Sequence, residues 1–420
     1  MDGTEVLIIG AGIGGLALGL MLHRRGIACR IYEAAPELRP LGVGINILPH
    51  ASKELGELGL DAALTRVAIL TKEAAFFNRF GQLIYREPLG RHAGYDWPQY
   101  SIHRGDLQAV LAGAFRERAG ADRLQLGWKC VRAEDGADGA TAHFVDGASG
   151  APLAPQRGRV VIGCDGVHSV LRKQFHPHEG DPVYSGVNMW RGVTRSPPML
   201  SGATMVRAGW LNPGKMVIYP IRDRIDAQGR QLVNWLAEIE TPHYLPKRDW
   251  ARPGRIDDFI RPYRDWHFDW CDVPELIRAA DAIYEYPMVD QDPLDRWTFG
   301  RLTLAGDAAH PMVPRGSNGA GQAILDARVL ADELDARRDP ADALRAYEAA
   351  RLPATAKVVL TNRTMPPDAI LREVKLRSGD RPFERIEDVI SREELAAMSE
   401  GYKKVAGYDQ ATLAGGPGGG

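Results

Sequence analysis

The pattern of apolar and polar positions begins with a strand, a turn and a helix. Residues 6–9 form a short β-branched apolar run, which is typical of a strand buried on both faces. A glycine-rich turn follows at once, and apolar residues then recur with helical spacing until Gly26. Residues 28–32 return to the strand pattern and end at Glu33. This order predicts a βαβ unit with glycines at its first turn.

The rest of the chain changes character twice. From about Pro182 to Pro293 it is rich in Trp, Tyr and Pro with short alternating segments, which predicts an antiparallel sheet facing a core or cavity. Residues 301–307 resume the buried-strand pattern, and residues 321–362 have helical spacing with a break expected at Pro353. Residues 366–413 predict short polar helices on the outside.

Together these elements predict an α/β fold: a discontinuous Rossmann-like domain, an inserted antiparallel-sheet domain for the substrate, and a helical C-terminus. The expected boundaries are 1–181 and 286–365 for the discontinuous domain, 182–285 for the insert, 366–413 for the C-terminal helices and 414–420 for a flexible, glycine-rich tail.

Composition excludes several classes of protein. The chain has 420 residues and a net charge of −2, which argues against a nucleic-acid binder or a basic membrane-surface protein. Its four cysteines form no C-x-x-C pair, so neither a disulfide framework nor a metal site is expected. The N-terminus is acidic and no apolar run approaches 18 residues, so we expect no signal peptide and no membrane span. A cytoplasmic enzyme is the expectation.

The first turn carries a G-x-G-x-x-G motif at Gly10, Gly12 and Gly15. Its glycines permit a tight turn, a close approach of a pyrophosphate to the backbone, and close packing of helix on strand. Glu33, 23 residues beyond Gly10, is placed to bind a ribose. The motif alone does not distinguish an NAD-binding from an FAD-binding protein. The alternative without a binding function is a glycine-rich turn that binds no nucleotide.

Two later segments have a related form. Residues 160–172 read as a strand that ends in Asp165-Gly166 and leads into a helix. Residues 302–311 read as a strand that ends in Gly306-Asp307, and a second glycine-rich loop at 313–322 opens another helix.

In this order the three motifs resemble the single-component FAD-dependent aromatic hydroxylases, the family of para-hydroxybenzoate and salicylate hydroxylases, over residues 5 to 365. Segments 39–46, 98–104, 189–194 and 286–290 are most similar to the branch that contains the N-methylphenazine-carboxylate monooxygenase. The resemblance implies FAD, NADH or NADPH as co-substrate, and O₂. It implies hydroxylation of a planar aromatic or N-heteroaromatic substrate through a flavin C4a-hydroperoxide.

The resemblance also implies roles for individual residues. Arg104 would reach the pyrophosphate, Asp307 the ribityl chain, and Asp165 the pyrophosphate region, although Asp165 alone could be a helix N-cap. The implied cofactor-binding set is Gly10, Gly12, Ile13, Gly14, Gly15, Glu33, Ala34, Val43, Gly44, Arg104, Cys130, Asp165, Gly166, Gly306, Asp307, Gly316, Gly319, Ala320 and Gly321.

Candidate substrate and catalytic residues follow from the same comparison. Pro314 would present a carbonyl to a substrate hydroxyl, and His310 could act as a base or be structural. The expected substrate contacts are Trp190, Arg191, Tyr219, Trp235, Met288 and Val313. The three aromatic residues could instead belong to the sheet core, and Arg191 could pair with a substrate carboxylate or be a satisfied arginine of the sheet.

Two other functions stay open at this stage. The first is a different flavin oxidoreductase on this fold, such as a reductase or oxidase, and the second is a binding protein that has lost the cofactor. No second dinucleotide motif is visible, so NAD(P)H is expected to dock transiently on the FAD-binding domain. A monomer or homodimer is expected.

Overall fold

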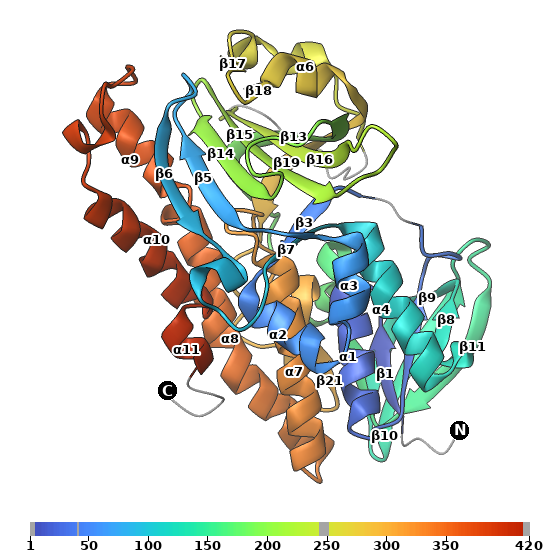
Figure 1. The fold of residues 1–420 in the computed structure, drawn as a ribbon. Coiled ribbons are helices and arrows are strands. Elements are labelled where there is room, and N and C mark those ends of the chain that lie inside the picture. Colours follow the sequence, from blue (N-terminus) through green and yellow to red (C-terminus); the bar gives the residue numbers. More distant parts are fainter. Residues whose placement is uncertain (1–4, 40–41, 243–251, 415–420) are drawn as a thin grey trace.

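A mostly parallel six-stranded sheet forms one half of the protein in the computed structural model, which describes residues 5–39, 42–242 and 252–414 (Figure 1). Its strand order is β20-β21-β12-β1-β2-β8, and only β20 is antiparallel to its neighbour. The predicted βαβ unit is β1, α1 and β2. The bounds are β1 (Val6–Ile9), β2 (Cys29–Glu33), β8 (Leu124–Leu126), β12 (Val160–Gly163), β20 (Thr298–Phe299), β21 (Leu302–Leu304), α1 (Ile13–Arg24), α4 (Arg104–Ala119), α5 (Val170–Phe175) and α7 (Gly319–Ala336).

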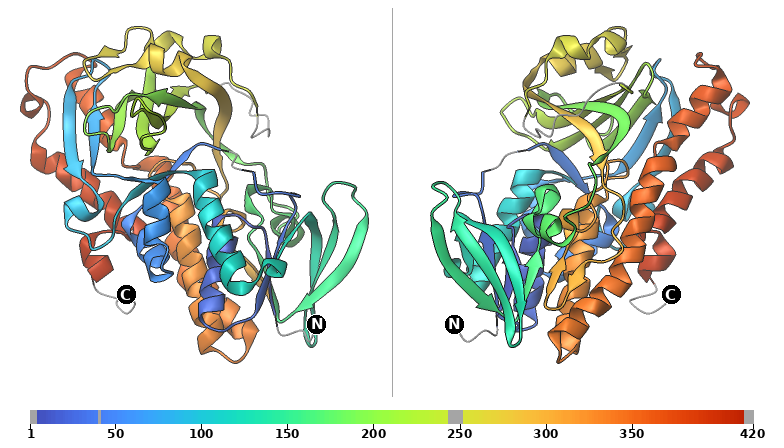
Figure 2. Two further views of the ribbon diagram at one scale, coloured as in Figure 1. Left: turned by 45° about the vertical axis from the view of Figure 1, so that its right-hand side comes forward. Right: turned by 180° about the vertical axis from the view of Figure 1, so that it is seen from behind.

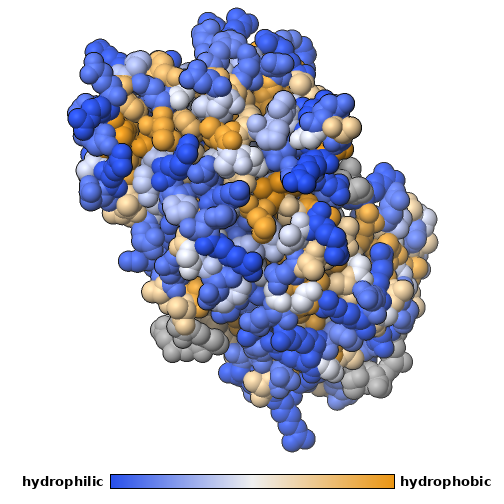
Figure 3. Space-filling model, in the orientation of Figure 1, coloured by the Kyte–Doolittle hydropathy of each residue, from blue (hydrophilic) through white to orange (hydrophobic). Residues whose placement is uncertain are grey.

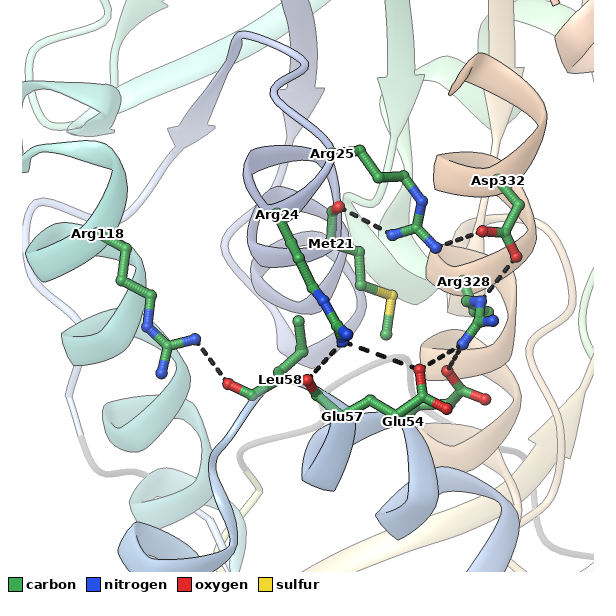
Figure 4. Close-up of polar contacts among 9 residues, drawn as sticks. All are labelled: Met21, Arg24, Arg25, Glu54, Glu57, Leu58, Arg118, Arg328 and Asp332. Atoms are coloured by element: carbon green, nitrogen blue, oxygen red, sulfur yellow. Dashed lines mark hydrogen bonds and ion pairs between the residues drawn. The ribbon is translucent and has the colours of Figure 1, made fainter. Parts of the chain in front are cut away.

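Polar contacts join the helices beside this sheet (Figure 4). Arg328 of α7 pairs with Glu54 and Glu57 of α2 (Pro49–Glu57) at 2.7 and 2.9 Å between nitrogen and oxygen. Arg118 of α4 donates a 2.7 Å hydrogen bond to the carbonyl of Leu58, just beyond α2. These contacts fix α2 against α4 and α7. The loops that lead into α4 and α7 are therefore held in place relative to each other.

A seven-stranded sheet, called here the substrate sheet, lies above the first half, with strand order β19-β13-β16-β15-β14-β5-β6 (Figure 1). The antiparallel sheet expected for 182–285 is present, but β5 and β6 extend it from a part of the chain that the sequence assigned to the first domain. β5 pairs in parallel with β14, a long-range contact that no local pattern marks. The bounds are β5 (Glu73–Phe77), β6 (Leu83–Pro88), β13 (Val183–Ser196), β14 (Thr204–Trp210), β15 (Gly214–Arg222), β16 (Gln231–Glu240) and β19 (Ala280–Asp290).

Smaller elements complete the two halves. A three-stranded sheet in the order β3-β7-β4 lies where the halves meet, and another, β11-β10-β9, flanks the parallel sheet. The bounds are β3 (Gly44–Ile47), β4 (Ile69–Leu70), β7 (Tyr100–His103), β9 (Trp128–Gly136), β10 (Gly139–Asp146), β11 (Pro152–Gly158), β17 (His267–Phe268), β18 (Cys271–Asp272), α3 (Asp61–Val67) and α6 (Val273–Arg278).

The C-terminal third is helical, as expected, but its break lies elsewhere. Residues 321–362 fall in α7 and α8 (Pro340–Thr364), and the chain turns at 337–339, not at Pro353, which lies inside α8. Asp339 accepts a hydrogen bond from the Ala341 backbone at 2.9 Å, and Pro340 occupies the first helical turn, so this sequence starts a new helix. Beyond it come α9 (Ala369–Ser378), α10 (Arg392–Ala406) and α11 (Gln410–Ala414). The views of Figure 2 show α8 and α10 running along the side of both halves.

The surface and termini add little to the picture. Apolar side chains in the view of Figure 3 form separate patches among polar ones, an ordinary surface for a folded domain. Among the described helices, none is long and apolar enough to cross a membrane. Residues 415–420 of the expected tail lie outside the described residues, as do Pro40 and Leu41, and Ala414 ends α11.

Candidate active site

Four loops meet at the carboxyl edge of the parallel sheet, where open α/β folds bind ligands. They follow β1, β2, β12 and β21 and carry the Gly10–Gly15 motif, Glu33, Asp165-Gly166 and Gly306-Asp307. The backbone amide of Gly10 donates to the Tyr32 carbonyl at 2.7 Å, and that of Cys164 to the Ile9 carbonyl at 2.7 Å. The parallel strands thus bring together motifs that are far apart in the sequence.

The geometry of the first glycine loop fits a pyrophosphate. A Cβ at Gly10 would overlap the Cys164 carbonyl, and one at Gly15 would overlap the Gly10 carbonyl, so both positions require glycine for packing. A Cβ at Gly12 would meet no atom within 4 Å. Gly12 is the N-cap of α1 and has no side-chain cap, which leaves the first-turn N–H groups free for an anion.

The acidic residues of these loops differ in what they already bind. The Glu33 carboxylate accepts hydrogen bonds from the amides of Ala11 (2.8 Å) and Ala35 (2.9 Å). These bonds tie Glu33 to the first glycine loop, so its carboxylate lies beside the glycines. Asp307 lines the cavity and is exposed to it, yet it lies deep in the protein, and this depth raises its pKa. Arg104 also lines the cavity and opposes that shift by its positive charge.

Asp165 has a capping contact. Its carboxylate accepts from the Ser169 hydroxyl at 2.6 Å and from the Val170 amide at 2.8 Å, at the start of α5, although the N-cap of α5 is Ser169 and not Asp165. Gly166 lines the cavity, whereas Cys130 is buried in the core beside the parallel sheet, and burial raises the pKa of its thiol to about 12. The Cys130 side chain is therefore part of the hydrophobic core. Ala34, also expected to bind the cofactor, is exposed beside Glu33.

His310 does not line the cavity, which favours the structural alternative over that of a base. It is buried, its Nε2 lies 2.6 Å from the carboxylate of Asp326, and it does not line the cavity. The same carboxylate accepts from the Gly306 amide at 2.9 Å and from Arg351 Nε at 2.7 Å. Although burial acts to raise the pKa of Asp326, His310 and Arg351 hold it well below its usual range. This buried network positions the Gly306-Asp307 turn.

The second glycine loop opens α7. Pro314, Gly316, Gly319 and Ala320 line the cavity, while Gly321 lies against the buried ring of His50. The N-cap of α7 is Asn318, which makes no side-chain cap, so the N–H groups of the first turn have no intrahelical acceptor. The Pro314 carbonyl accepts a 3.2 Å hydrogen bond from the Ser317 amide and retains a second lone pair.

The C-terminal helices support this loop from behind. The Tyr402 hydroxyl of α10 accepts from Asn318 Nδ2 at 2.9 Å and donates to Asn362 Oδ1 at 2.6 Å. A Cβ at Gly316, whose φ is +84°, would overlap that hydroxyl. The loop is therefore held between the cavity and α10.

The substrate sheet covers the loops and encloses a cavity of about 290 Å³. Strand alternation sorts its side chains onto two faces. The cavity face consists of Arg191, Met205, Arg207, Val217, Tyr219, Leu236 and Glu238. Trp190 and Trp235 point to the opposite face, where they pack with Phe259 in a core beside α6. These two tryptophans therefore do not line the cavity, contrary to the prediction that they contact the substrate. Met288 and Val313 pack in the cluster that contains Met205 and Leu236, next to the cavity.

Three side chains of the substrate sheet hold the segment at Gly44. The Gly44 carbonyl accepts from the Tyr219 hydroxyl at 2.8 Å and from Arg191 Nη2 at 2.7 Å, and its amide donates to Asn234 Oδ1 at 2.7 Å. A Cβ at Gly44 would come within 2.8 Å of Tyr219 and Asn234, so glycine is required for this close approach. Burial lowers the pKa of Arg191 and raises that of Tyr219. Val43, beside Gly44, is buried.

A buried ionic cluster beside the cavity had no signal in the sequence. Lys215 pairs with Glu238 at 2.9 Å and with Asp368, and Arg207 pairs with Asp368 at 2.8 Å. Burial acts to raise the pKa of Asp368, but Lys215 and Arg207 hold it below the usual value. Asp368 precedes α9, more than 150 residues after Lys215, so only the tertiary fold brings the cluster together.

Comparison with known proteins shows the family of this chain. A family described as an FAD binding domain matches residues 3–240 and 279–362, and the chain belongs to that family. The chain is 41% identical over 363 residues (86% of this chain, 89% of the relative) to the phenazine 1,6-dicarboxylic acid hydroxylase PhzS of Lysobacter antibioticus. It is 36% identical over 398 residues (91% of each) to the 3-amino-4-hydroxybenzoate 2-monooxygenase PtnB3 of Streptomyces platensis.

A solved structure shows the same fold with the cofactor. HpxO of Klebsiella pneumoniae, complexed with FAD and uric acid, superposes with a TM-score of 0.75 at 25% identity and covers 100% of this chain and 99% of its own. The protein is therefore an FAD-dependent aromatic hydroxylase, an NAD(P)H- and O₂-dependent monooxygenase, as the sequence resemblance implied. The relatives do not favour the alternative of a reductase or oxidase.

Proposed function

We propose that this enzyme hydroxylates a planar aromatic or N-heteroaromatic ring held between the cavity face of the substrate sheet and the loop at Pro314. The observation that carries the proposal is the cavity itself, because one wall consists of two glycine loops with open N–H groups and the other includes Met205, Val217 and Leu236. Apolar side chains opposite a cofactor, with polar groups among them, suit a ring that carries polar substituents. The named relatives act on a phenazine dicarboxylic acid and an amino-hydroxybenzoate.

In this proposal the loops hold FAD. The first turn of α1 and Arg104 bind the pyrophosphate, Glu33 the ribose, Asp307 the ribityl chain, and the first turn of α7 the flavin edge that becomes anionic on reduction. FAD held by these residues would supply the redox chemistry, accepting a hydride from NAD(P)H and allowing one oxygen atom of O₂ to reach the ring while the other leaves as water. The protein orients the ring between the sheet and the loop at Pro314. NAD(P)H docks transiently beside FAD, with no separate nucleotide fold.

Purification followed by titration tests the proposal. The holoenzyme should absorb as a flavoprotein, and one aromatic compound in a panel should accelerate NADH or NADPH oxidation and gain one oxygen atom. Asp307→Asn removes a charge-assisted hydrogen bond of about 1.5–3 kcal/mol, so its FAD dissociation constant should rise by about ten- to a hundredfold. Asp138→Asn, at an 88% exposed side chain, is the control. Flavin turnover that ignores every ring compound would contradict the proposal.

Location and assembly are also proposed here. We place the enzyme in the cytoplasm, because its described cysteines are free thiols, and expect a monomer or homodimer. Cell fractionation and light scattering on the eluted protein test the two statements separately.

A further inference from the structure

The first turn of α7 is uncapped although an asparagine occupies its N-cap. Asparagine is among the strongest N-cap residues, because its side-chain oxygen ordinarily accepts a hydrogen bond from a backbone amide of the first turn. Asn318 makes no such bond, and its backbone is helical (φ −101°, ψ −20°), not extended as in a capping residue. The N–H groups of residues 319–321 therefore remain open at the cavity, which Asn318, Gly319 and Ala320 line.

The side chain of Asn318 is tied to α10 instead. Its Nδ2 donates to the Tyr402 hydroxyl at 2.9 Å, and that hydroxyl donates to Asn362 Oδ1 of α8 at 2.6 Å. Burial raises the pKa of Tyr402, so the hydroxyl keeps the proton that the second bond requires. Oδ1 of Asn318 is buried and accepts no hydrogen bond of normal geometry from the described residues, although an interaction with His50 opposes the fall in the pKa of that ring. Tyr402 is thus the hydrogen-bond partner that fixes the amide of Asn318.

Tyr402 is itself held firmly on α10. The Ser399 hydroxyl, one turn earlier, donates to the Glu87 carboxylate of β6 at 2.7 Å, and Lys403 pairs with the same carboxylate at 3.0 Å. A Cβ at Gly316 would overlap the Tyr402 hydroxyl, so the loop that leads into α7 lies directly against it. In this way α10 connects the edge strand of the substrate sheet to the N-cap of α7, which lies 84 residues before Tyr402 in the chain.

The open N–H groups of a helix N-terminus stabilise an anion, and a cap from the helix's own N-cap side chain would compete for them. We propose that Tyr402 is a positioning residue for the cofactor: it holds Asn318 away from the first turn of α7 and so keeps the N–H groups of that turn available to reduced, anionic flavin. This inference rests on the proposed function, in which that turn meets the flavin edge. It adds α10 to the cofactor site, although the match to the FAD binding domain family ends at residue 362.

A double-mutant cycle on the holoenzyme tests the inference. Tyr402→Phe frees the Asn318 side chain to cap the turn, so the affinity for reduced FAD relative to oxidised FAD should fall about tenfold. For a two-electron couple that change lowers the midpoint potential by about 30 mV. Asn318→Ala has no oxygen with which to cap, so its potential should equal that of the wild type. In the Asn318→Ala background, Tyr402→Phe should have no effect. Anaerobic redox titration against a reference dye measures all four proteins without any ring compound.

A matched control and three contrary outcomes complete the test. Tyr263→Phe also removes a buried hydroxyl with two hydrogen-bond partners, the carbonyls of Lys215 and Glu238, and it should leave the potential unchanged. An unshifted potential in Tyr402→Phe overturns the inference. A fall of equal size in both backgrounds assigns Tyr402 to general support of the loop and overturns it too. A fall in Asn318→Ala alone would mean that the Asn318 side chain serves FAD directly, which also overturns it and needs no Tyr402 variant.

The proposed function is tested by a separate measurement. If the turnover of the holoenzyme ignores every ring compound, the proposed function fails, whatever the potentials of the variants are. If a ring compound is hydroxylated but the potentials do not follow the cycle, only the inference about Tyr402 fails.

Discussion

The Tyr219 hydroxyl donates a 2.8 Å hydrogen bond to the carbonyl of Gly44 and so joins the substrate sheet to the segment that enters the cavity. Arg191 donates to the same oxygen from β13. Two residues that the sequence offered as substrate contacts thus hold a backbone segment in place. Their position still brings both side chains to the cavity wall.

Tyr219→Phe should therefore change the site without opening the fold. It removes one of the two hydrogen bonds to the Gly44 carbonyl, and the free energy of unfolding should fall by about 1 kcal/mol. The KM for the ring substrate and the flavin absorbance maximum should shift, because the Gly44 segment is less firmly held. Tyr263→Phe is the matched control, since its hydroxyl donates on the opposite face, to the carbonyls of Lys215 and Glu238. It should cost similar stability and leave the spectrum alone, and equal spectral effects would contradict the assignment.

His310→Gln should separate structure from catalysis. The histidine is paired with Asp326 and turned away from the cavity, so its loss should lower the free energy of unfolding by about 1–3 kcal/mol. At saturating FAD, kcat should change by less than about tenfold, whereas removal of a general base typically costs 10²–10⁴. Steady-state kinetics over a pH series decide the question. A large loss of kcat with a changed pH profile would restore His310 as a base.

Two glycines of the first loop should respond oppositely to alanine. Gly12→Ala places its Cβ in open space, so the apoprotein should unfold at an unchanged temperature. The same Cβ faces the phosphates in the proposed complex, so FAD affinity should fall by about ten- to a hundredfold, as overpacking by 1–3 kcal/mol implies. Gly15→Ala collides with the Gly10 carbonyl and should destabilise the apoprotein itself. Thermal unfolding and FAD fluorescence titration of both apoproteins measure the contrast.

His50 should make the protein sensitive to mild acid. Burial, with Arg351 nearby, lowers its pKa to about 3 in the folded state, while its unfolded pKa is near 6.5. The unfolded chain therefore binds the proton first, so this stability is complete above pH 6.5 and is lost as the pH falls toward 3. The slope for one site is at most about 1.4 kcal/mol per pH unit.

His50→Leu should flatten the free energy of unfolding between pH 6.5 and 5. Urea denaturation at several pH values measures that slope for the variant and the wild type. Parallel profiles for the two proteins would show that His50 does not carry the effect.

Local sequence patterns were sufficient to predict those parts of the site that lie within a single loop. The glycine motif, Glu33 and the Gly306-Asp307 turn sit at strand ends, and period-2 and helical spacing identified those strands and helices. The fold class was correct for this reason, whereas FAD was implied by the resemblance that the three motifs carry in this order. Alternation alone could not say which face of the substrate sheet meets the cavity, and the neighbours Trp190 and Arg191 necessarily point opposite ways.

Features that depend on distant partners could not be predicted. Nothing near His310 indicates that Asp326, in the first half of α7, binds its ring. The ionic cluster needs Lys215 from β15 and Asp368 from the start of α9, and the pairing of β5 with β14 joins strands that lie more than 120 residues apart. Arg315 lies in the glycine-rich loop at 313–322, but that its Nε and Nη2 have no acceptor among the described residues becomes visible only in the folded structure.

The mixed origin of the substrate sheet has a consequence for engineering. The hairpin of β5 and β6, the long insert that ends with β19, and Asp368 before α9 all contribute to the same wall of the cavity or its support. A chimaera that takes only residues 182–285 from a relative would therefore place the central strands of the relative's sheet beside the original β5 and β6. It would also keep the original Asp368 as the partner of the cluster's cations. Ring specificity in this architecture should be exchangeable only when all three stretches of chain move together.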